Sequence, residues 1–169
     1  MKLIQTITGV LAMLGFICAA QFAIEATPPS GISFTPVARA TLPEFNVKRK
    51  DKTLDWRIGL DADQPIDVAT QIVTFQPHGF SGWHTHPGPV FFTVRTGTLI
   101  VYEGDDPSCT PIVFAAGTGA VEAGTGTHIH MVRNETGSVA EAVVTYLVPV
   151  GTPQNQLRTD LPNPGNCPF

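Results

Sequence analysis

The sequence predicts an all-β protein, an antiparallel sandwich or barrel, and three observations support this prediction. From residue 68 onward the chain contains short runs rich in Val, Ile, Thr, Phe and Tyr, the residues that strands favour. Gly, Pro, Asn or Asp bounds these runs, which recur about every ten residues, as in sandwiches and barrels. No segment keeps the 3.6-residue period of an amphipathic helix. The predicted strands are residues 68–75, 90–97, 98–104, 111–117, 128–134 and 141–151.

A chain of 169 residues is long enough for one compact domain and too short for two. Turn-forming residues in "RTGT" (95–98) and "NETG" (134–137) predict hairpins between neighbouring strands. The expected segments are a signal peptide (1–26), a Pro-rich lead-in with short strands such as 32–40 (27–67), a single barrel domain (68–150) and a C-terminal tail (151–169).

The first 26 residues have the composition of a secretory signal peptide. Lys2 precedes a long apolar run that ends among small residues, and cleavage after Ala20 or after Ala26 would satisfy the small-residue rule. An uncleaved signal anchor is the alternative, because the run approaches the roughly 20 residues that span a bilayer. We expect cleavage, a secreted or periplasmic protein, and no membrane attachment afterwards.

Cysteine usage agrees with export. Cys18 would leave with the signal peptide, and the mature chain would keep Cys109 and Cys167, an even number in an oxidising compartment. We expect a disulfide between them that ties the C-terminal tail to the loop around Cys109, with two unpaired buried thiols as the alternative. In the chain-entropy model such a bond stabilises the fold by roughly 4 kcal/mol.

The charge balance excludes nucleic acid as a partner. The chain has 14 acidic and 10 basic residues, a formal net charge of -4, and no basic stripe with interleaved aromatic residues. The one basic cluster, "KRKDK" at 48–52, is interrupted by Asp51 and is expected to be a solvated loop.

Four of the five histidines form two His-x-His pairs, His84 with His86 and His128 with His130. In a strand, residues i and i+2 point to the same face, so the two imidazoles of a pair aim at one spot. If a barrel brings the two pairs side by side, three or four ring nitrogens converge, which predicts a divalent metal site. His78 lies outside this spacing and is expected in a loop.

At these residues the chain resembles the cupin family, over about residues 69–149. The matching positions are Gly79, His84, His86 and Gly97 in the first motif, and Gly119, His130 and Asn134 in the second. The whole chain is also similar to secreted bacterial cupin-domain proteins. The resemblance implies a cupin-type double-stranded β-helix, which is a jelly-roll barrel, with His84, His86 and His130 as metal ligands.

Two departures from the family pattern leave the site open. The family's Glu ligand falls on Val90, which cannot coordinate a metal ion, and Thr125 and Thr127 replace the Pro and Gly of the second motif. Three interpretations follow: a neutral three-histidine centre, a centre that recruits His128 as a fourth ligand, or a barrel that has lost its metal. The missing carboxylate disfavours the manganese chemistry of the oxalate oxidases in this family.

The resemblance implies a secreted metal-binding protein, with Fe, Zn, Mn, Cu or Ni as the ion and a small molecule as its partner. With Fe or Cu, we expect dioxygenase-like oxidation of a chelating small molecule, and the alternative is a non-catalytic barrel that binds a small ligand or a metal. No residue is a clear general base, and we expect Glu122, Tyr102 and Arg95 on the surface or in cross-strand contacts. By analogy with the family, the lead-in from Thr27 could pair two chains as a homodimer.

Overall fold

The computed structural model describes residues 25–124 and 128–169. Residues 1–24, with the predicted cleavage site after Ala20, and the two threonines of the second motif lie outside this part of the chain. The described residues form twelve strands and one short 3-10 helix, η1 (Gln154–Gln156), which confirms the all-β prediction. None of the described segments is a helix with the length and apolar character needed to cross a membrane.

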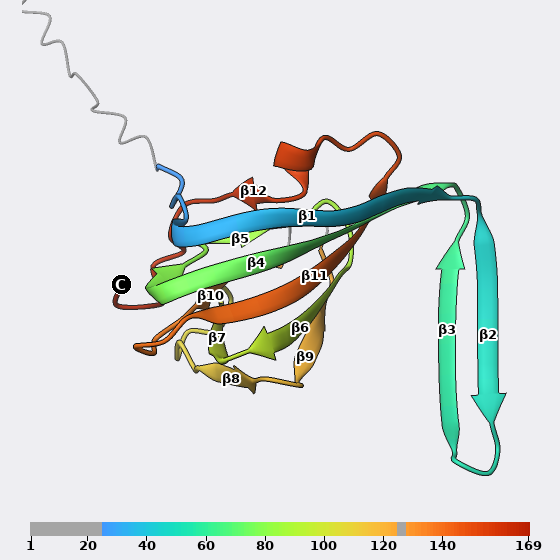
Figure 1. The fold of residues 1–169 in the computed structure, drawn as a ribbon, viewed down its shortest axis with the longest axis horizontal. Helices are drawn as coiled ribbons and strands as arrows, with labels where there is room; N and C mark the ends of the chain where they lie inside the picture. Colours follow the sequence, from blue (N-terminus) through green and yellow to red (C-terminus); the bar gives the residue numbers. More distant parts are fainter. Residues whose placement is uncertain (1–24, 125–127) are drawn as a thin grey trace, which may run out of the picture.

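Ten strands form two antiparallel layers that face each other. The first layer, in spatial order, is β1 (Ser30–Leu42), β4 (Ile66–Phe80), β11 (Ala140–Pro149), β6 (Val90–Thr96) and β9 (Gly119–Glu122). The second is β12 (Thr159–Asp160), β5 (His84–Thr85), β10 (His130–Arg133), β7 (Thr98–Glu103) and β8 (Ile112–Ala115). The end of β4 pairs with β10 and joins the layers, and the result is a nearly closed barrel consistent with a cupin-type double-stranded β-helix (Figure 1).

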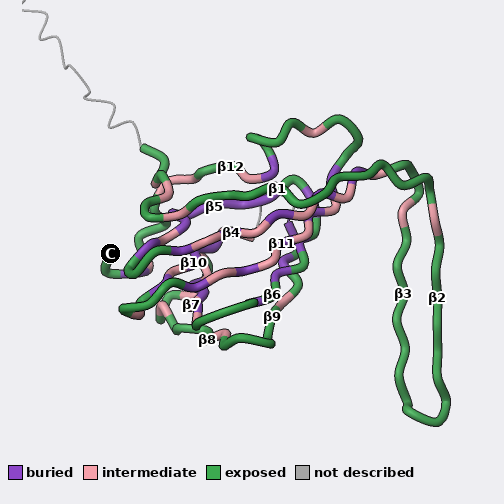
Figure 2. Tube along the Cα trace, in the orientation of Figure 1, coloured by how far each residue is buried: buried purple, intermediate pink, exposed green. Residues whose placement is uncertain are grey.

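Alternation along β4 and β11 builds the core. Buried and half-buried residues alternate along both strands, as expected where one face of a sheet lines an interior (Figure 2). Val73 and Phe75 of β4 and Val144 and Val148 of β11 lie in one cluster of buried side chains with residues of β6 and β7. Several side chains of this cluster lie next to the buried polar residues of the barrel interior.

The two predicted hairpins are wrong. The turn around Gly97 connects β6 to β7, which lie in different layers and have other strands as partners, and 134–139 likewise connects β10 to β11 across the layers. Consecutive strands of a double-stranded β-helix alternate between layers, so a short turn need not be a hairpin. Gly97 has φ of 76°, and a Cβ atom there would lie 2.8 Å from the Cβ of Ala140, so the crossing requires a glycine.

The lead-in contributes one long strand and a separate two-stranded hairpin. β1 pairs with β4 along its length, so it extends the first layer instead of crossing the surface irregularly. β2 (Phe45–Asp51) and β3 (Trp56–Ala62) pair with each other and project from one end of the barrel (Figure 1). The "KRKDK" cluster is exposed as expected, but it lies mainly on β2 and not in a loop.

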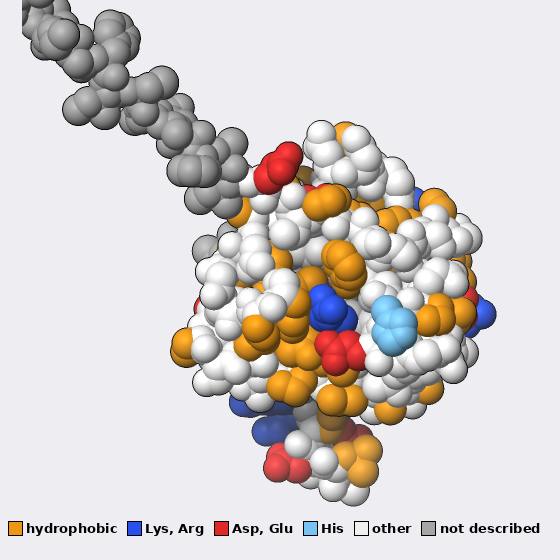
Figure 3. Space-filling view, turned by 90° about the vertical axis from the view of Figure 1, so that its left-hand side faces the viewer, with side chains coloured by type: hydrophobic (Ala, Val, Ile, Leu, Met, Phe, Trp, Pro, Cys, Tyr) orange, Lys and Arg blue, Asp and Glu red, His pale blue; other side chains and the backbone are white. Residues whose placement is uncertain are grey.

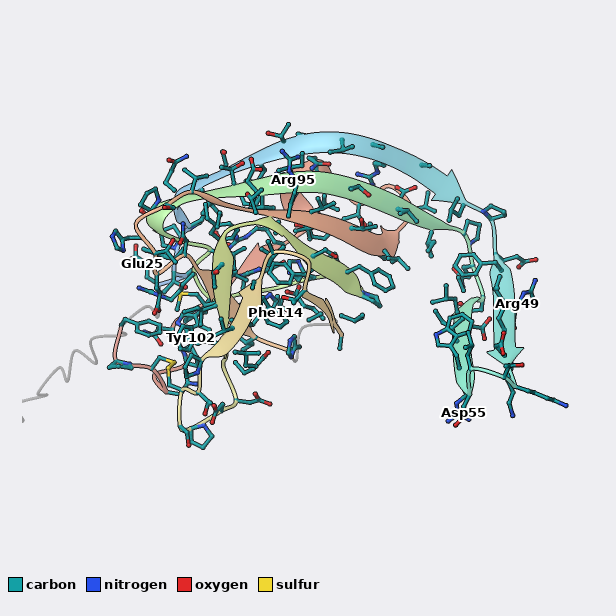
Figure 4. All side chains as sticks on the ribbon, turned by 60° about the horizontal axis from the view of Figure 1, so that its bottom comes forward. Glu25, Arg49, Asp55, Arg95, Tyr102 and Phe114 are labelled. Atoms are coloured by element: carbon teal, nitrogen blue, oxygen red, sulfur yellow. A yellow bond between two sulfur atoms is a disulfide. The ribbon has the colours of Figure 1, made fainter. Side chains whose placement is uncertain are left out.

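The C-terminal tail covers the outer face of the second layer. Cys167 forms a disulfide with Cys109, with Cα atoms 5.2 Å apart, and packs in a second buried cluster with Trp83, Tyr102 and Met131. Figure 4 shows the disulfide close to Tyr102. The tail therefore buries the side chains that alternation turns away from the barrel interior.

Candidate metal centre

Three histidines converge inside the barrel. His84 on β5 lies directly opposite His130 on β10, and His86 follows β5 by one residue. All three are buried, and one ring nitrogen from each lies within 4.8 Å of the others. The ring centroid of His130 lies 4.3 Å from that of His84 and 5.3 Å from that of His86. The pair spacing in the sequence thus produces the convergence predicted for His84, His86 and His130.

Backbone carbonyls orient two of these rings. His84 Nδ1 lies 3.0 Å from the carbonyl oxygen of Gly82, and His86 Nδ1 lies 2.8 Å from that of Leu157. A carbonyl only accepts hydrogen bonds, so each Nδ1 carries the hydrogen and each neutral ring keeps a lone pair on Nε2. This is the arrangement that fixes metal-ligating histidines in proteins.

Glu122 supplies the carboxylate that position 90 lacks. It lies on β9 directly opposite Val90 on β6, so both side chains face the interior from neighbouring strands. Glu122 is buried, with Oε2 3.2 Å from His86 Nε2 and Oε1 3.4 Å from His130 Nε2. The expectation of a surface or merely cross-strand carboxylate at Glu122 is therefore wrong, because its partner strand holds it against the histidines.

A proton or a metal ion between His86 and Glu122 would satisfy both groups. The Nε2 lone pair of His86 faces a carboxylate oxygen, and two acceptors at this distance repel each other unless a proton or a metal ion lies between them. His130 is 1% exposed, yet neither of its ring nitrogens has a hydrogen-bond partner. Its separation from Glu122 is within ion-pair range but is not aligned as a hydrogen bond. Buried polar atoms without partners are rare and need an explanation.

The distances from Glu122 to two of the histidines suit a shared ion, whereas the nitrogens of the three histidines are spread over up to 4.8 Å. Two ligand atoms that each lie about 2.0 to 2.4 Å from an ion, at an angle of about 90 to 109°, are roughly 2.8 to 3.9 Å apart. The separations from Glu122 to His86 and His130, 3.2 and 3.4 Å, fall in this range. The donor set of three imidazoles and one carboxylate is suited to a divalent first-row metal.

The protonation states also suit a metal. Burial lowers the pKa of His84 well below its usual 6.5, and the neighbouring His130 adds to this effect. Burial likewise lowers the pKa of His130 to about 4, although Glu122 opposes it. Burial raises the pKa of Glu122, but the nearby histidines more than offset this and the pKa is lowered overall. At neutral pH, His84 and His130 are neutral and Glu122 is ionised, which is the ligand form of each.

His128 lies beside this centre and is not one of the three clustered histidines. Its Nε2 atom lies 3.3 Å from Glu103 Oε2, and its ring centroid lies 5.2 Å from that of His130. The two rings of this pair are therefore neighbours, as predicted, but the Nε2 atom of His128 lies against Glu103 and is not one of the three clustered nitrogens.

Several other residues singled out in the sequence have structural roles. Arg95 forms an ion pair with Glu141, and the Tyr102 hydroxyl donates to Glu135. Asn134 is buried and donates from Nδ2 to three backbone carbonyls, two on β4 and one in the turn before β11. His78 is exposed at the irregular end of β4, with φ of 61°.

Residues from distant segments complete the site and could not be identified from sequence spacing. A cavity of about 30 Å³ adjoins His84 and His86, and Tyr146 and Arg158 contribute to its wall. The Tyr146 hydroxyl accepts a hydrogen bond from Gln71 Nε2 at 2.7 Å. Arg158 is held by the carbonyl oxygen of Ser81 and by the carboxylate of Asp160. These side chains reach the site only through the long-range pairing of β4 with β11 and of β12 with β5.

No protein-family model matches the chain, and no curated protein matches it. Among solved structures, a recombinant oxalate oxidase in complex with glycolate is 27% identical, with a TM-score of 0.39, over 46% of this chain and 40% of that chain. A protein with a double-stranded β-helix domain from Klebsiella pneumoniae is 16% identical, with a TM-score of 0.44, over 75% of this chain and 84% of that one. A DMSP lyase from Ruegeria pomeroyi is 16% identical, with a TM-score of 0.44, over 54% of this chain and 42% of that one. The chain thus spans less than half the length of the oxalate oxidase and lyase chains.

Proposed function

We propose that this is an exported metalloprotein whose single divalent ion is held by His84, His86, His130 and Glu122, and that it oxidises a small anionic molecule in a dioxygenase-like reaction. The observation that carries the proposal is the lone pair of His86 Nε2 facing the Glu122 carboxylate at 3.2 Å. A cation at that point satisfies both groups. Fe, Mn, Zn, Cu and Ni all accept imidazole and carboxylate ligands, and the O₂-dependent reaction requires a redox-active ion.

Charge favours an anionic substrate. Three neutral imidazoles and one carboxylate leave a divalent site with one net positive charge in a low-dielectric interior. The Arg158 guanidinium also lines the cavity wall, where its ion pair with Asp160 offsets part of its charge. A small carboxylate could therefore contact both the ion and the guanidinium.

The shape of the site limits the size of the reacting group. A cavity of about 30 Å³ holds little more than a water molecule or a group of similar size. Phe34 and Arg158 line both this cavity and an outer groove of about 640 Å³. In the proposed reaction the remainder of the substrate lies in the groove, Arg158 orients its charged end, and Phe34 limits the entry of water.

Manganese chemistry was disfavoured because Val90 cannot supply a carboxylate ligand, and Glu122 is in a position to supply one. A carboxylate ligand is available from the opposite strand, at the same face of the barrel. Oxidation of a small carboxylate is therefore as compatible with this donor set as dioxygenation of a neutral chelator.

Export is part of the proposal. The Cys109–Cys167 disulfide is of the kind that persists in oxidising compartments, and the composition of residues 1–26 is that of a signal peptide. We infer a secreted or periplasmic location.

A non-catalytic barrel that stores metal or binds a small ligand is the second candidate, and the small size of the inner cavity favours it. Metal analysis of the purified protein, followed by O₂ consumption with a panel of small carboxylates, tests both. We expect one ion per chain and turnover that weakens in Arg158→Gln, mainly through a higher KM. Arg95→Gln is the matched control, because Arg95 is exposed and pairs with Glu141. One ion per chain without turnover would favour the second candidate, and a native protein without metal would exclude the metalloenzyme and the metal-storing barrel.

A further inference from the structure

The β2–β3 hairpin, which we call the arm (residues 45–62), pairs with no other strand in the described part of the chain. Its two strands pair only with each other, while ten other strands form the barrel. It projects beyond the barrel in Figure 1, and Figure 4 shows Arg49 and Asp55 on it, far from the barrel strands. An isolated two-stranded hairpin is marginally stable in water. An arm of this kind therefore needs a surface to pack against.

The register gives the arm one mainly apolar face and one polar face. Antiparallel partners point to the same side, so the pairs Phe45 with Ala62 and Val47 with Leu60 share a face. Ile58 and Trp56 continue this face toward the turn, where their partners Arg49 and Asp51 add one charge of each sign. The opposite face carries Asn46 with Asp61, Lys48 with Gly59 and Lys50 with Arg57. The exposed fractions of Val47, Leu60, Ile58 and Trp56 are 40%, 40%, 43% and 51%, which is high for large apolar side chains.

A groove of about 1030 Å³ lies where the arm joins the barrel. Phe45 and Leu60 of the arm line one side, and Phe91 and Val121 of the barrel line another. Phe91 and Val121 are antiparallel partners on β6 and β9, so they form one apolar patch, and Val121 is 64% exposed. The chain thus carries an exposed apolar arm and an exposed apolar groove of the kind that such an arm could fill.

Charge is complementary between the arm and the rest of the chain. The arm contains five of the chain's ten basic residues and three acidic residues: Lys48, Arg49, Lys50, Lys52 and Arg57 against Asp51, Asp55 and Asp61. Outside the arm, the described residues contain four arginines and eleven carboxylates. Figure 3 shows the arm protruding below the barrel, with basic side chains gathered on it. A basic arm and an acidic barrel attract each other between copies.

We propose that the arm docks in the groove of a second copy of this chain, and that the second copy's arm docks in the first. Such an exchange is an isologous contact, in which the same patch serves both subunits and the assembly closes as a dimer. The apolar side chains run along the whole arm from Phe45 to Trp56 instead of gathering at the turn. A long groove covers such a face, whereas insertion into a membrane surface would use the turn, where Leu54 is 76% exposed.

Sedimentation of the purified protein with its disulfide intact tests the proposal. We expect a dimer whose dissociation constant rises about 30-fold or more in Leu60→Glu and in Val121→Glu. Val113→Glu is the matched control, because Val113 is 61% exposed on β8 and does not line the groove. A monomeric native protein, or equal weakening by Val113→Glu and Val121→Glu, would overturn the proposal. So would a monomer that binds anionic vesicles and loses this binding in Leu54→Glu.

A measurement on the unaltered chain guards against variants that fail to fold. Amide hydrogen exchange of residues 45–62 should slow as the protein concentration increases a hundredfold, because docking protects a hairpin that is otherwise marginal. Exchange of β4 should not change over the same range. Arm exchange that is independent of concentration, in a protein that sediments as a monomer, would refute docking between copies.

Discussion

Replacing Glu122 with Gln tests the candidate centre most directly. The substitution keeps the size of the side chain and removes its negative charge. If an ion lies about 2.2 Å from the carboxylate, the gross attraction between a divalent ion and one negative charge is roughly 15 kcal/mol at an effective dielectric constant of about 20. Desolvation of both partners offsets most of this energy. A residual loss of at least about 2.7 kcal/mol, a hundredfold increase in Kd, is therefore the smallest effect that we expect.

The assay separates loss of a ligand from loss of the fold. The metal-free protein and the variant are titrated with Mn²⁺ or Zn²⁺ in a calorimeter, and thermal unfolding is followed in parallel. Without metal, Glu122→Gln should be as stable as the native protein, because the amide can donate to the His86 Nε2 lone pair that the carboxylate oxygen faces. Glu141→Gln is the control, because Glu141 pairs with Arg95. Unchanged metal affinity in Glu122→Gln would refute the assignment of Glu122.

Three further predictions concern the opposite positions 90 and 122, the disulfide and Asp67. Glu122→Val should lose metal, and adding Val90→Glu should restore stoichiometric binding, because the two positions lie opposite each other on one face; metal analysis of both variants checks this, and no recovery would contradict it. Replacing both Cys109 and Cys167 with Ser should lower the free energy of unfolding by about 2 to 4 kcal/mol, measured by denaturant titration. Asp67 accepts hydrogen bonds from the side chains of Thr41 and Arg39 and from the amide of Gly151. These hydrogen bonds lower its pKa from 3.8 to about 2. The native melting temperature should therefore fall as the pH decreases from about 4 to about 2. The Asp67→Asn variant should have a lower melting temperature than the native protein at neutral pH, and its melting temperature should change less between about pH 4 and about pH 2. Equal changes in melting temperature for the two proteins over this pH range would contradict the reasoning.

The alternating segments of the chain could be predicted from the sequence alone. β4 and β11 show the buried and half-buried alternation that their Val, Ile and Thr runs indicate. The convergence of His84 and His86 follows from the same rule. The ring of His128 likewise lies beside that of His130, but its Nε2 atom contacts Glu103 instead of joining the cluster. Alternation therefore predicts which side chains are neighbours, and does not predict the partner that each ring nitrogen takes.

The layer assignment and the arm could not be predicted in this way. The turn at Gly97 has hairpin composition, yet it passes from one layer to the other, because β6 pairs with β11 and β9 while β7 pairs with β10 and β8. Pairing between distant segments depends on which apolar faces can be buried together, and a short window of sequence contains no information on this. The composition of the lead-in likewise predicts an irregular segment, although β1 pairs with β4 along its length.

Glu122 shows why a motif read along the chain can misjudge a metal site. A motif compares positions by their order in the sequence, so Val90 registers as a lost ligand, and the neutral three-histidine and metal-free interpretations both follow from that loss. A metal ion instead binds donor side chains that are close together in space, whichever strands they belong to. Val90 and Glu122 are opposite neighbours on that face, so a carboxylate from either position reaches the same region of the interior. Glu122 is 32 positions from Val90 in the printed sequence, and only the pairing of β6 with β9 makes the two equivalent. The absence of a motif ligand is therefore evidence of lost metal binding only after the opposite residue on the neighbouring strand has been identified.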